Sequence, residues 1–228
     1  PVFSVNIVHM DQQDILKRAC ELYVTGGSEA VSMRRLASDL GVTAPALYRH
    51  YASKEQILLD VVMEAFGLFT SYLTQALTGQ TAAERLYLSG KGHLDFALQH
   101  PMLYEMLFIP AHALGVEEFP EQIKSRLASL SQFYDDRVRE CMEAGLLQAQ
   151  DPHEVSLTLW GHAHGMVSIY LRGCHPMDEE QFRAAYWASC GRVMQGIATA
   201  DYATAMHEVT EHADITPRPP APQPTVTT

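Results

Sequence analysis

The stretch that most constrains this chain is residues 31–58, VSMRRLASDLGVTAPALYRHYASKEQIL. Ser32 is a good helix N-cap, and apolar residues recur behind it at helical spacing to about Leu40. Gly41 can then take the left-handed conformation of a sharp turn, and Thr43 can cap a second helix over about 44–50. Two helices joined by a short glycine turn are typical of a helix-turn-helix, whose second helix enters the DNA major groove.

The residues that follow the turn make this pattern specific, because glycine and helical periodicity alone occur in many helical hairpins. The chain carries, in order, Leu36-Ala37, Gly41-Val42-Thr43, Leu47-Tyr48, His50-Tyr51, Lys54-Glu55 and Ile57-Leu58. At these positions it resembles the tetracycline-repressor (TetR) family of bacterial transcription regulators. The motif resemblance covers about residues 11–60, whereas the remaining chain resembles the family only in length and helical pattern.

The resemblance implies a set of DNA-contacting residues around the second helix. The positions that carry or adjoin the contacts in that family match Thr43, Ala44, Pro45, Ala46, Tyr48, His50 and Lys54. Arg34 and Arg49 add guanidinium groups with the reach for phosphates or guanine edges. In the alternative interpretation, Tyr48 and His50 only pack and cap.

The distribution of charge limits where nucleic acid can bind. The formal net charge is −11, which argues against a generally basic coat and against attraction to an anionic membrane. Residues 1–54 carry a net +1 and the rest carries −12. DNA binding would therefore be local, with the acidic body held away from phosphate.

Cysteine spacing and hydropathy bear on the compartment. The four cysteines, Cys20, Cys141, Cys174 and Cys190, lie far apart within helical patterns, which favours buried free thiols over disulfides. No run of apolar residues approaches the ~18 of a membrane span, and the first ten residues lack the basic segment of a signal peptide. We therefore expect a cytoplasmic protein with no membrane partner.

Beyond the turn motif the chain is a succession of amphipathic helical patterns, with no convincing strand and no internal repeat. Helices are expected at about 11–25, 53–77, 82–99, 101–108, 121–147, 154–171 and 179–198. The predicted fold is all-α with about nine helices. We expect a disordered N-terminal extension at 1–10, a helix-turn-helix domain at 11–56, a helical effector-binding and dimerisation domain at 57–200, and a frayed helix with a Pro-rich disordered tail at 201–228.

Aromatic and methionine side chains are dense in the acidic body. Most are ordinary core by composition, yet a helical body that binds an apolar effector draws its pocket from this population. Trp160 and His164 form the best pair, because they stand four apart on one helix face. The predicted effector-binding residues, in a cavity bounded by the connector helix 54–77, are Phe66, Phe69, Phe108, Phe133, Trp160 and His164.

The helices at 154–171 and 179–198 carry unusually small residues, which let helices approach closely. This pattern suits a dimeric four-helix bundle, although close packing within one subunit would use it equally well. The residues predicted at the dimer interface are Gly161, Gly165, Ala185, Ala188 and Ser189.

Metal and catalytic signals are weak in this sequence. His162 and His164 are two apart and point ~200° apart on a helix, so they cannot jointly hold one ion. No catalytic motif is present, and no cofactor, metal or catalytic residue is predicted. The sequence therefore predicts a homodimeric regulator, which the resemblance makes a repressor released from operator DNA by a small molecule. An enzyme or a protein-binding scaffold with an incidental helix-turn-helix remains the alternative.

Overall fold

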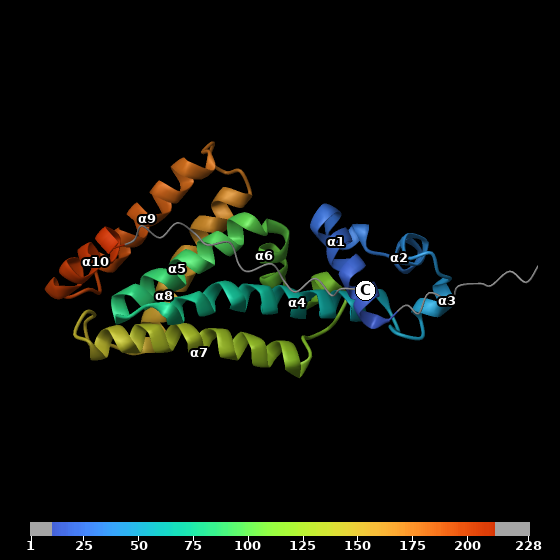
Figure 1. Cartoon of the computed structure of the whole chain (residues 1–228), viewed down its shortest axis with the longest axis horizontal. Coiled ribbons are helices and arrows are strands. Elements are labelled where there is room, and N and C mark those ends of the chain that lie inside the picture. Colours follow the sequence, from blue (N-terminus) through green and yellow to red (C-terminus); the bar gives the residue numbers. More distant parts are fainter. Residues whose placement is uncertain (1–10, 213–228) are drawn as a thin grey trace, which may run out of the picture. The chain divides into compact units, whose positions relative to one another are not determined.

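The computed structural model describes residues 11–212, so the predicted N-terminal extension and the Pro-rich part of the predicted tail lie outside the described residues. The described part is all-α, as predicted, with ten α-helices and two short 3-10 helices (Figure 1). In chain order the helices are α1 (Gln12–Ala30), α2 (Met33–Asp39), α3 (Ala44–Leu47), α4 (Lys54–Thr74), η1 (Gln75–Thr78), α5 (Ala82–Gln99), α6 (Pro101–Leu107), η2 (Ala111–Leu114), α7 (Glu121–Glu143), α8 (Pro152–Leu171), α9 (Glu179–Gln195) and α10 (Ala200–His212).

The chain forms two compact units, and α4 contributes residues to both. The first unit contains the chain up to Gly67 together with Met102–Ile123, and the second contains Leu68–Pro101 and the chain from Lys124 onward. The predicted boundary at residues 56/57 therefore differs from this division. The first unit includes eleven further residues of α4, 57–67, and nearly all of α6.

Within the first unit, α1 to α4 close a small apolar core. Ile15 and Leu22 of α1, Leu36 of α2, Leu47 of α3 and Tyr51 are almost completely buried. The Tyr51 hydroxyl donates to the Asp60 carboxylate at 2.8 Å. This core holds the helix-turn-helix against the first turns of α4.

The predicted end of the first helix is confirmed as a backbone break. Gly26 and Gly27 have non-helical dihedrals, with φ of +62° at Gly27, and a last turn continues to Ala30. A Cβ at Gly27 would lie 3.6 Å from the Met102 methyl of α6. The double glycine thus ends the regular helix and lets α6 pack against it.

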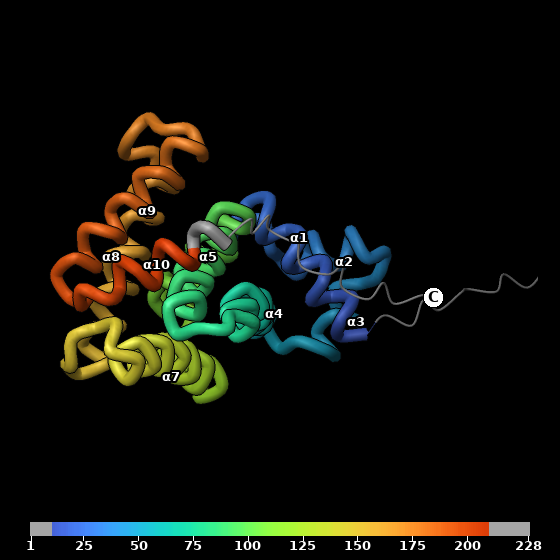
Figure 2. The backbone as a smooth tube through the Cα atoms, turned by 60° about the vertical axis from the view of Figure 1, so that its left-hand side comes forward, coloured from blue at the N-terminus to red at the C-terminus, as the bar shows by residue number. Residues whose placement is uncertain are grey.

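The second unit is built around α5. Helix η1 packs along α5, as do α8 and α10, and α8 packs on α9 (Figure 2). Gly92 of α5 allows a close approach, because a Cβ there would lie 2.5 Å from the Tyr72 carbonyl oxygen. The salt bridge from Arg85 of α5 to Glu140 of α7, at 2.8 Å, ties these two helices together.

Three sequence expectations need correction in the body. The frayed helix predicted from residue 201 is a regular helix, α10, which packs on α5 and buries Val209. Cys174 is exposed rather than buried. The segment Lys54–Thr78 is long and apolar enough to cross a membrane by length and composition, contrary to the sequence argument. Half of its apolar window is buried inside the protein, as expected for the core helix of a globular fold.

Candidate nucleic-acid interface and ligand pocket

The turn between α2 and α3 has the geometry that the sequence predicts. The Ser32 hydroxyl caps α2 by accepting a hydrogen bond from the backbone N–H of Arg35 at 3.2 Å. Gly41 adopts φ of +66°, and the Val42 N–H donates to the Ala37 carbonyl at 2.9 Å. Because an L side chain is strained at this φ, Gly41 is what permits the sharp turn.

Helix α3 is shorter than predicted and is capped differently. It spans Ala44–Leu47, followed by turns through His50. Thr43 occupies the N-cap position, but its side chain makes no capping hydrogen bond, so the predicted capping role is wrong. Its hydroxyl lies on an exposed residue beside the exposed Pro45. A hydroxyl that does not cap is available to a phosphate oxygen.

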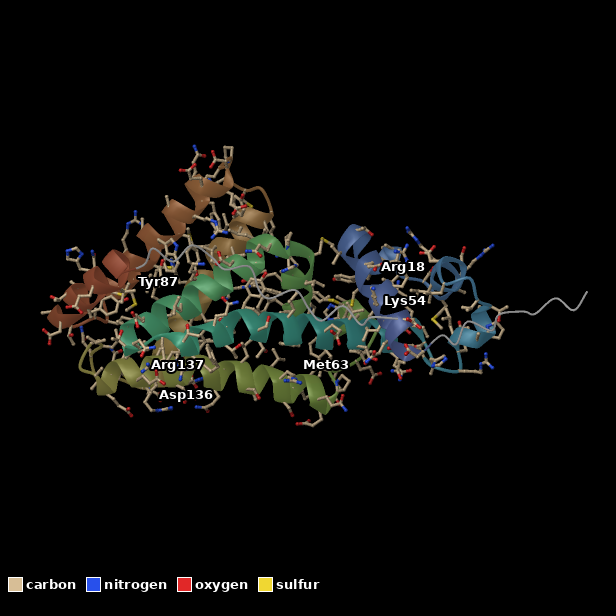
Figure 3. The ribbon with its side chains drawn as sticks, viewed as in Figure 1. Arg18, Lys54, Met63, Tyr87, Asp136 and Arg137 are labelled. Carbon is tan, nitrogen blue, oxygen red and sulfur yellow. The ribbon has the colours of Figure 1, made fainter. Side chains whose placement is uncertain are left out.

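The side chains predicted to contact DNA lie on the outside of the first unit. Tyr48 is 55% exposed, although tyrosine has a large apolar ring. Arg34 and Arg49 are also exposed, and neither forms an ion pair with another described residue. Ala44, Ala46, His50 and Lys54 are half-buried, and Figure 3 shows Lys54 at the beginning of α4. All nine predicted positions therefore come from one unit.

A neighbouring charge cluster is neutralised within the protein. Arg18 of α1 donates to the Asp39 carboxylate from Nε at 2.9 Å and from Nη2 at 2.7 Å, and also pairs with Glu21. These carboxylates raise the pKa of Arg18, Glu21 more than Asp39. The Asp39 carboxylate is thereby screened from an incoming phosphate, which leaves the local field to Arg34, Arg49 and Lys54.

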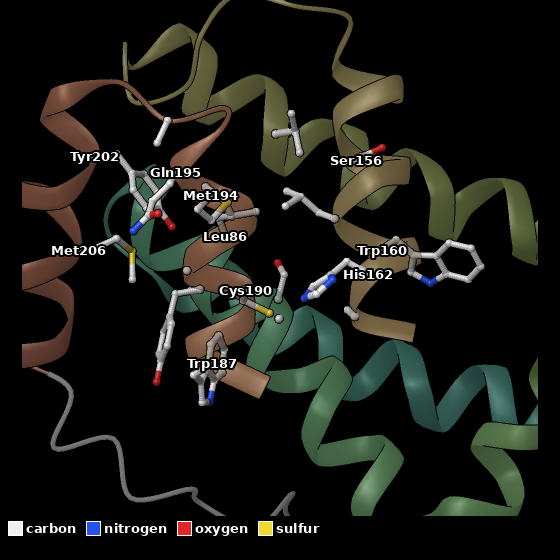
Figure 4. Close-up of a pocket in the computed structure, with 18 of the residues that line it drawn as sticks. Leu86, Ser156, Trp160, His162, Trp187, Cys190, Met194, Gln195, Tyr202 and Met206 are labelled. Carbon is white, nitrogen blue, oxygen red and sulfur yellow. The ribbon is translucent and has the colours of Figure 1, made fainter. Parts of the chain in front are cut away.

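An apolar pocket lies entirely within the second unit (Figure 4). It has a volume of about 900 Å³, and α5, α7, α8, α9 and α10 line it. The rings of Trp187 and Tyr87 lie 4.9 Å apart between centroids with a tilt of 30°, and Tyr186 meets Trp187 edge-on at 5.3 Å. Tyr202 and Met206 of α10 add a further apolar wall.

Several polar groups of the pocket are engaged elsewhere in the protein. The Ser156 hydroxyl donates to the Asp135 carboxylate, and the Ser89 hydroxyl donates to the Arg85 carbonyl at 2.7 Å. His93 Nδ1 lies 3.1 Å from the Tyr134 hydroxyl, and burial lowers the pKa of His93 to about 3. Burial also raises the pKa of the Cys190 thiol to about 11. Both groups are therefore neutral near pH 7.

The pocket contains only one of the six residues predicted to bind an effector, Trp160. Phe66 and Phe108 belong to the first unit, where Phe108 packs edge-on against Tyr104. Phe69 stacks on Phe96 at 4.8 Å and is fully buried core.

The other two predicted residues are occupied by neighbours. The Arg137 guanidinium lies 5.0 Å from the centroid of the Phe133 ring. The predicted face shared by Trp160 and His164 is real, with their rings stacked at 5.4 Å, but His164 does not line the pocket. The pocket instead takes His162, which sequence reasoning considered only as a metal ligand, together with α9 and α10.

Some of the small residues predicted at a dimer interface are exposed on the surface of the second unit. Gly161 and Ala188 are exposed, whereas Gly165, Ala185 and Ser189 are half-buried. A Cβ at Gly161 or Gly165 would meet no atom within 4 Å. On the same helix Leu157 is 54% exposed and Ile169 is 45% exposed. An apolar face with room for another backbone is thus present on α8.

Among the described residues, no group of three or more His, Cys, Asp or Glu side chains is placed to hold a metal ion.

Comparisons with known proteins relate both parts of this chain to described families. A family model described as bacterial regulatory proteins, tetR family, matches residues 15–61, and one described as tetracyclin repressor-like, C-terminal domain, matches residues 86–189. A curated relative, the nucleoid occlusion factor SlmA of Pasteurella multocida, is 36% identical over 115 residues, which is 50% of this chain and 54% of the relative. The chain thus spans about half the length of the curated relatives that it matches first.

Solved structures share the fold at low sequence identity. A protein of unknown function from Rhodococcus sp. RHA1 is 19% identical with a TM-score of 0.72, covering 85% of this chain and all of the other. AibR in complex with isovaleryl coenzyme A and operator DNA is 21% identical with a TM-score of 0.61, covering 79% of this chain and 96% of the other. The two family models cover most of the chain, one on the helix-turn-helix and one on the helical body. The chain therefore belongs to the TetR family of DNA-binding transcriptional regulators.

Proposed function

We propose that the protein is a cytoplasmic, homodimeric repressor that leaves a palindromic operator when a small, mainly apolar molecule binds its body. The observation that carries this proposal is the exposed group around α3. Tyr48 and Arg49 stand outside the small core directly after the Gly41 turn, where a large aromatic ring has no packing reason to be exposed. An element of this kind reads DNA from the major groove.

Dimerisation follows from the needs of selective binding. One short recognition helix makes few base contacts, whereas a two-fold dimer doubles the site and fixes a spacing of ~34–36 Å between the two reading heads. The exposed α8 and α9 face, with Gly161, Ala188, Leu157 and Ile169, supports the pairing. Burying such a face would remove exposed apolar area from water.

The pocket supports control by a ligand. A molecule bound there weakens operator affinity only if it binds one arrangement of the dimer better than the other, and a tenfold preference corresponds to ~1.4 kcal/mol. Its apolar walls and lack of a catalytic arrangement favour binding over turnover. We therefore propose that the body acts as a sensor rather than as an enzyme.

The experiment is an unbiased selection of bound DNA followed by mobility shift. We expect a two-fold symmetric site whose half-sites are one helical turn, ~10–10.5 base pairs, apart. Arg49→Ala is expected to relax base preference or weaken binding at least tenfold, whereas Arg126→Ala, an exposed arginine of α7, leaves affinity unchanged. Recovery of no enriched sequence by the dimer would overturn the proposal.

A second candidate function comes from the relatives. Several of the curated proteins that match are nucleoid occlusion factors, so a role in nucleoid occlusion, rather than at one promoter, is the second candidate for this chain. Mapping of bound sites in cells separates the two: a few promoter sites support the repressor, and many dispersed sites with altered division upon deletion support the alternative.

A further inference from the structure

The pocket in the body has no formally charged side chain among its lining residues, all of which are apolar, aromatic, small or neutral polar. The carboxylates that neighbour lining residues are already engaged, since Asp135 accepts from the Ser156 hydroxyl and Asp95 pairs with Lys91 at 2.5 Å and with Arg183 at 2.6 Å. A ligand anion or cation inside the pocket would lose its hydration without gaining a counter-ion. The lining therefore selects for an uncharged molecule.

The dimensions of the pocket indicate a wide ligand. Its α9 wall runs from Tyr186 to Gln195, a separation of roughly 13.5 Å at the rise of an α-helix. A volume of about 900 Å³ over that length gives a mean cross-section of roughly 65 Å². This cross-section is several times that of one extended acyl chain, so a broad molecule matches the breadth of the pocket better than a single chain does. Fused rings match this width, and the aromatic rings of Tyr87 and Trp187, tilted by 30° to one another, supply apolar ring area on one side.

One buried polar atom of the pocket has no hydrogen-bond partner among residues 11–212. His162 Nε2 is buried and makes no hydrogen bond in the described structure, unlike the hydroxyls of Ser89 and Ser156. Figure 4 shows the His162 ring projecting from α8 toward the α9 side of the pocket, where Cys190 lies. An unpaired buried nitrogen costs free energy, and a ligand group that pairs with it recovers that cost.

We propose that the pocket binds an uncharged, rigid molecule of two or more fused rings, whose single hydroxyl or carbonyl group pairs with His162 Nε2. This inference rests on the proposed function, because it names the chemistry of the effector. Ring area against Tyr87, Trp187 and Met194 supplies affinity, and His162 supplies orientation and selectivity. Multiply charged esters and free carboxylic acids are excluded from the pocket itself.

The test uses four probes of one shape, none of which absorbs where tryptophan is excited. They are 2-decalol, its hydrocarbon parent decalin, decalin-2-carboxylate and 2-aminodecalin. The chain has two tryptophans, Trp160 and Trp187, and both line the pocket, so their emission reports binding directly. We expect 2-decalol to bind about fivefold to tenfold tighter than decalin and at least tenfold tighter than the two charged probes.

Variants at His162 separate hydrogen bonding from packing. His162→Phe is expected to bind 2-decalol and decalin equally well, whereas His162→Gln, which keeps a hydrogen-bonding group, retains part of the preference for the alcohol. The control is His175→Phe, which places the same ring at an exposed position between α8 and α9 and leaves the preference intact. Far-ultraviolet circular dichroism confirms that each variant is folded before titration.

Several outcomes would overturn the inference. Binding of the carboxylate or the amine as tightly as the alcohol would reject an uncharged ligand, and an alcohol preference that survives in His162→Phe would reject the role of His162. Absence of any emission change with all four probes would reject ligand binding at this pocket. Operator binding measured on the same samples keeps the two questions apart, because a protein that binds DNA but no probe contradicts this inference alone.

Discussion

The residues of the candidate DNA-binding site in the first unit, called the reading unit below, and those of the pocket in the second unit are distributed differently along the sequence. The reading unit gathers its candidate contacts within residues 34–54, and each residue has a fixed place relative to the turn at Gly41. The pocket collects its walls from five helices between Leu86 and Met206, from side chains that elsewhere form ordinary core. A site built from neighbouring residues can therefore be recognised in the sequence as a motif. A site built from several helices can be recognised only when the packing of the helix faces is known.

The largest expected effect tests whether the body controls the reading unit through assembly. Ala188→Trp places a large ring on the exposed face of α9, and we expect a monomer whose operator affinity falls more than ~100-fold, because one reading head replaces two. Light scattering and mobility shift measure the two effects. Ala128→Trp on exposed α7 is the matched control, and a stable Ala188→Trp dimer with full affinity would remove this face from the interface.

The second expected effect is a pH dependence of the free energy of unfolding that arises from His93 in the second unit. Burial lowers the pKa of His93 to about 3, whereas the unfolded chain has an ordinary histidine. Below a pH of about 6.5, His93 therefore binds a proton in the unfolded state but stays neutral in the native state. The free energy of unfolding consequently falls as the pH falls. From pH 7.5 to pH 5 this group is expected to remove about 2 kcal/mol of the free energy of unfolding, at about 1.4 kcal/mol per pH unit below 6.5.

Urea unfolding at the two pH values measures this loss. His93→Gln keeps a partner for the Tyr134 hydroxyl while removing the titrating ring, so its pH dependence is expected to be flatter by about the same amount. Equal slopes for the two proteins would show that His93 is not the group responsible, and His100 and His164, whose pKa values burial also lowers, would be examined next.

A smaller effect is expected from one cation in the reading unit. Lys54 begins α4, where backbone N–H groups also attract phosphate, and Lys54→Ala is expected to weaken operator binding about tenfold. The slope of log affinity against log salt concentration is expected to fall by about one. Lys124→Ala, on exposed α7, is the control. An unchanged slope for Lys54→Ala would exclude a phosphate contact at this position.

An effect of similar size is expected from a substitution in the turn itself. Gly41 has φ of +66°, and a Cβ there would meet no atom within 4 Å, so Gly41→Ala costs only backbone strain. We expect a loss of about 1–2 kcal/mol in the free energy of unfolding, measured by urea titration of the whole chain. Gly145→Ala, with φ of +74° in open space in the second unit, is the control for strain outside the turn. A Gly41→Ala protein as stable as the parent would mean that the turn relaxes to another geometry.

Local chemistry explains which parts of the fold the sequence could predict. Ser32 caps its helix and Gly41 turns with positive φ, because each depends on a few neighbouring residues. The Thr43 side chain does not cap as expected, since a hydroxyl next to a helix start has solvent as an equal partner. Helix α10 was underestimated for a different reason. Its order comes from packing on α5, more than a hundred residues earlier in the chain.

The candidate pocket shows where sequence reasoning ends. The stacking of Trp160 on His164 follows from their spacing of four residues and was predictable. The same helical geometry turns His162 to a different face, and only the arrangement of α9 and α10 places that face against a cavity. An unpaired His162 Nε2 has no signature in sequence, because the missing partner is a property of the surroundings rather than of the residue.

Because α10 lines the pocket, the order of synthesis determines when the pocket is complete. Residues 146–148, which follow α7, pair with residues 197–199 before α10: the Gln148 N–H donates to the Ile197 carbonyl at 2.9 Å and the Thr199 N–H donates to the Leu146 carbonyl at 3.0 Å. On the ribosome, α1 to α3 are complete long before α10 emerges, and their contacts are short-range, so the reading unit gains its fold early. The last wall of the pocket forms only after α10 has been synthesised. The nascent chain would therefore acquire its helix-turn-helix before the pocket in its body is complete.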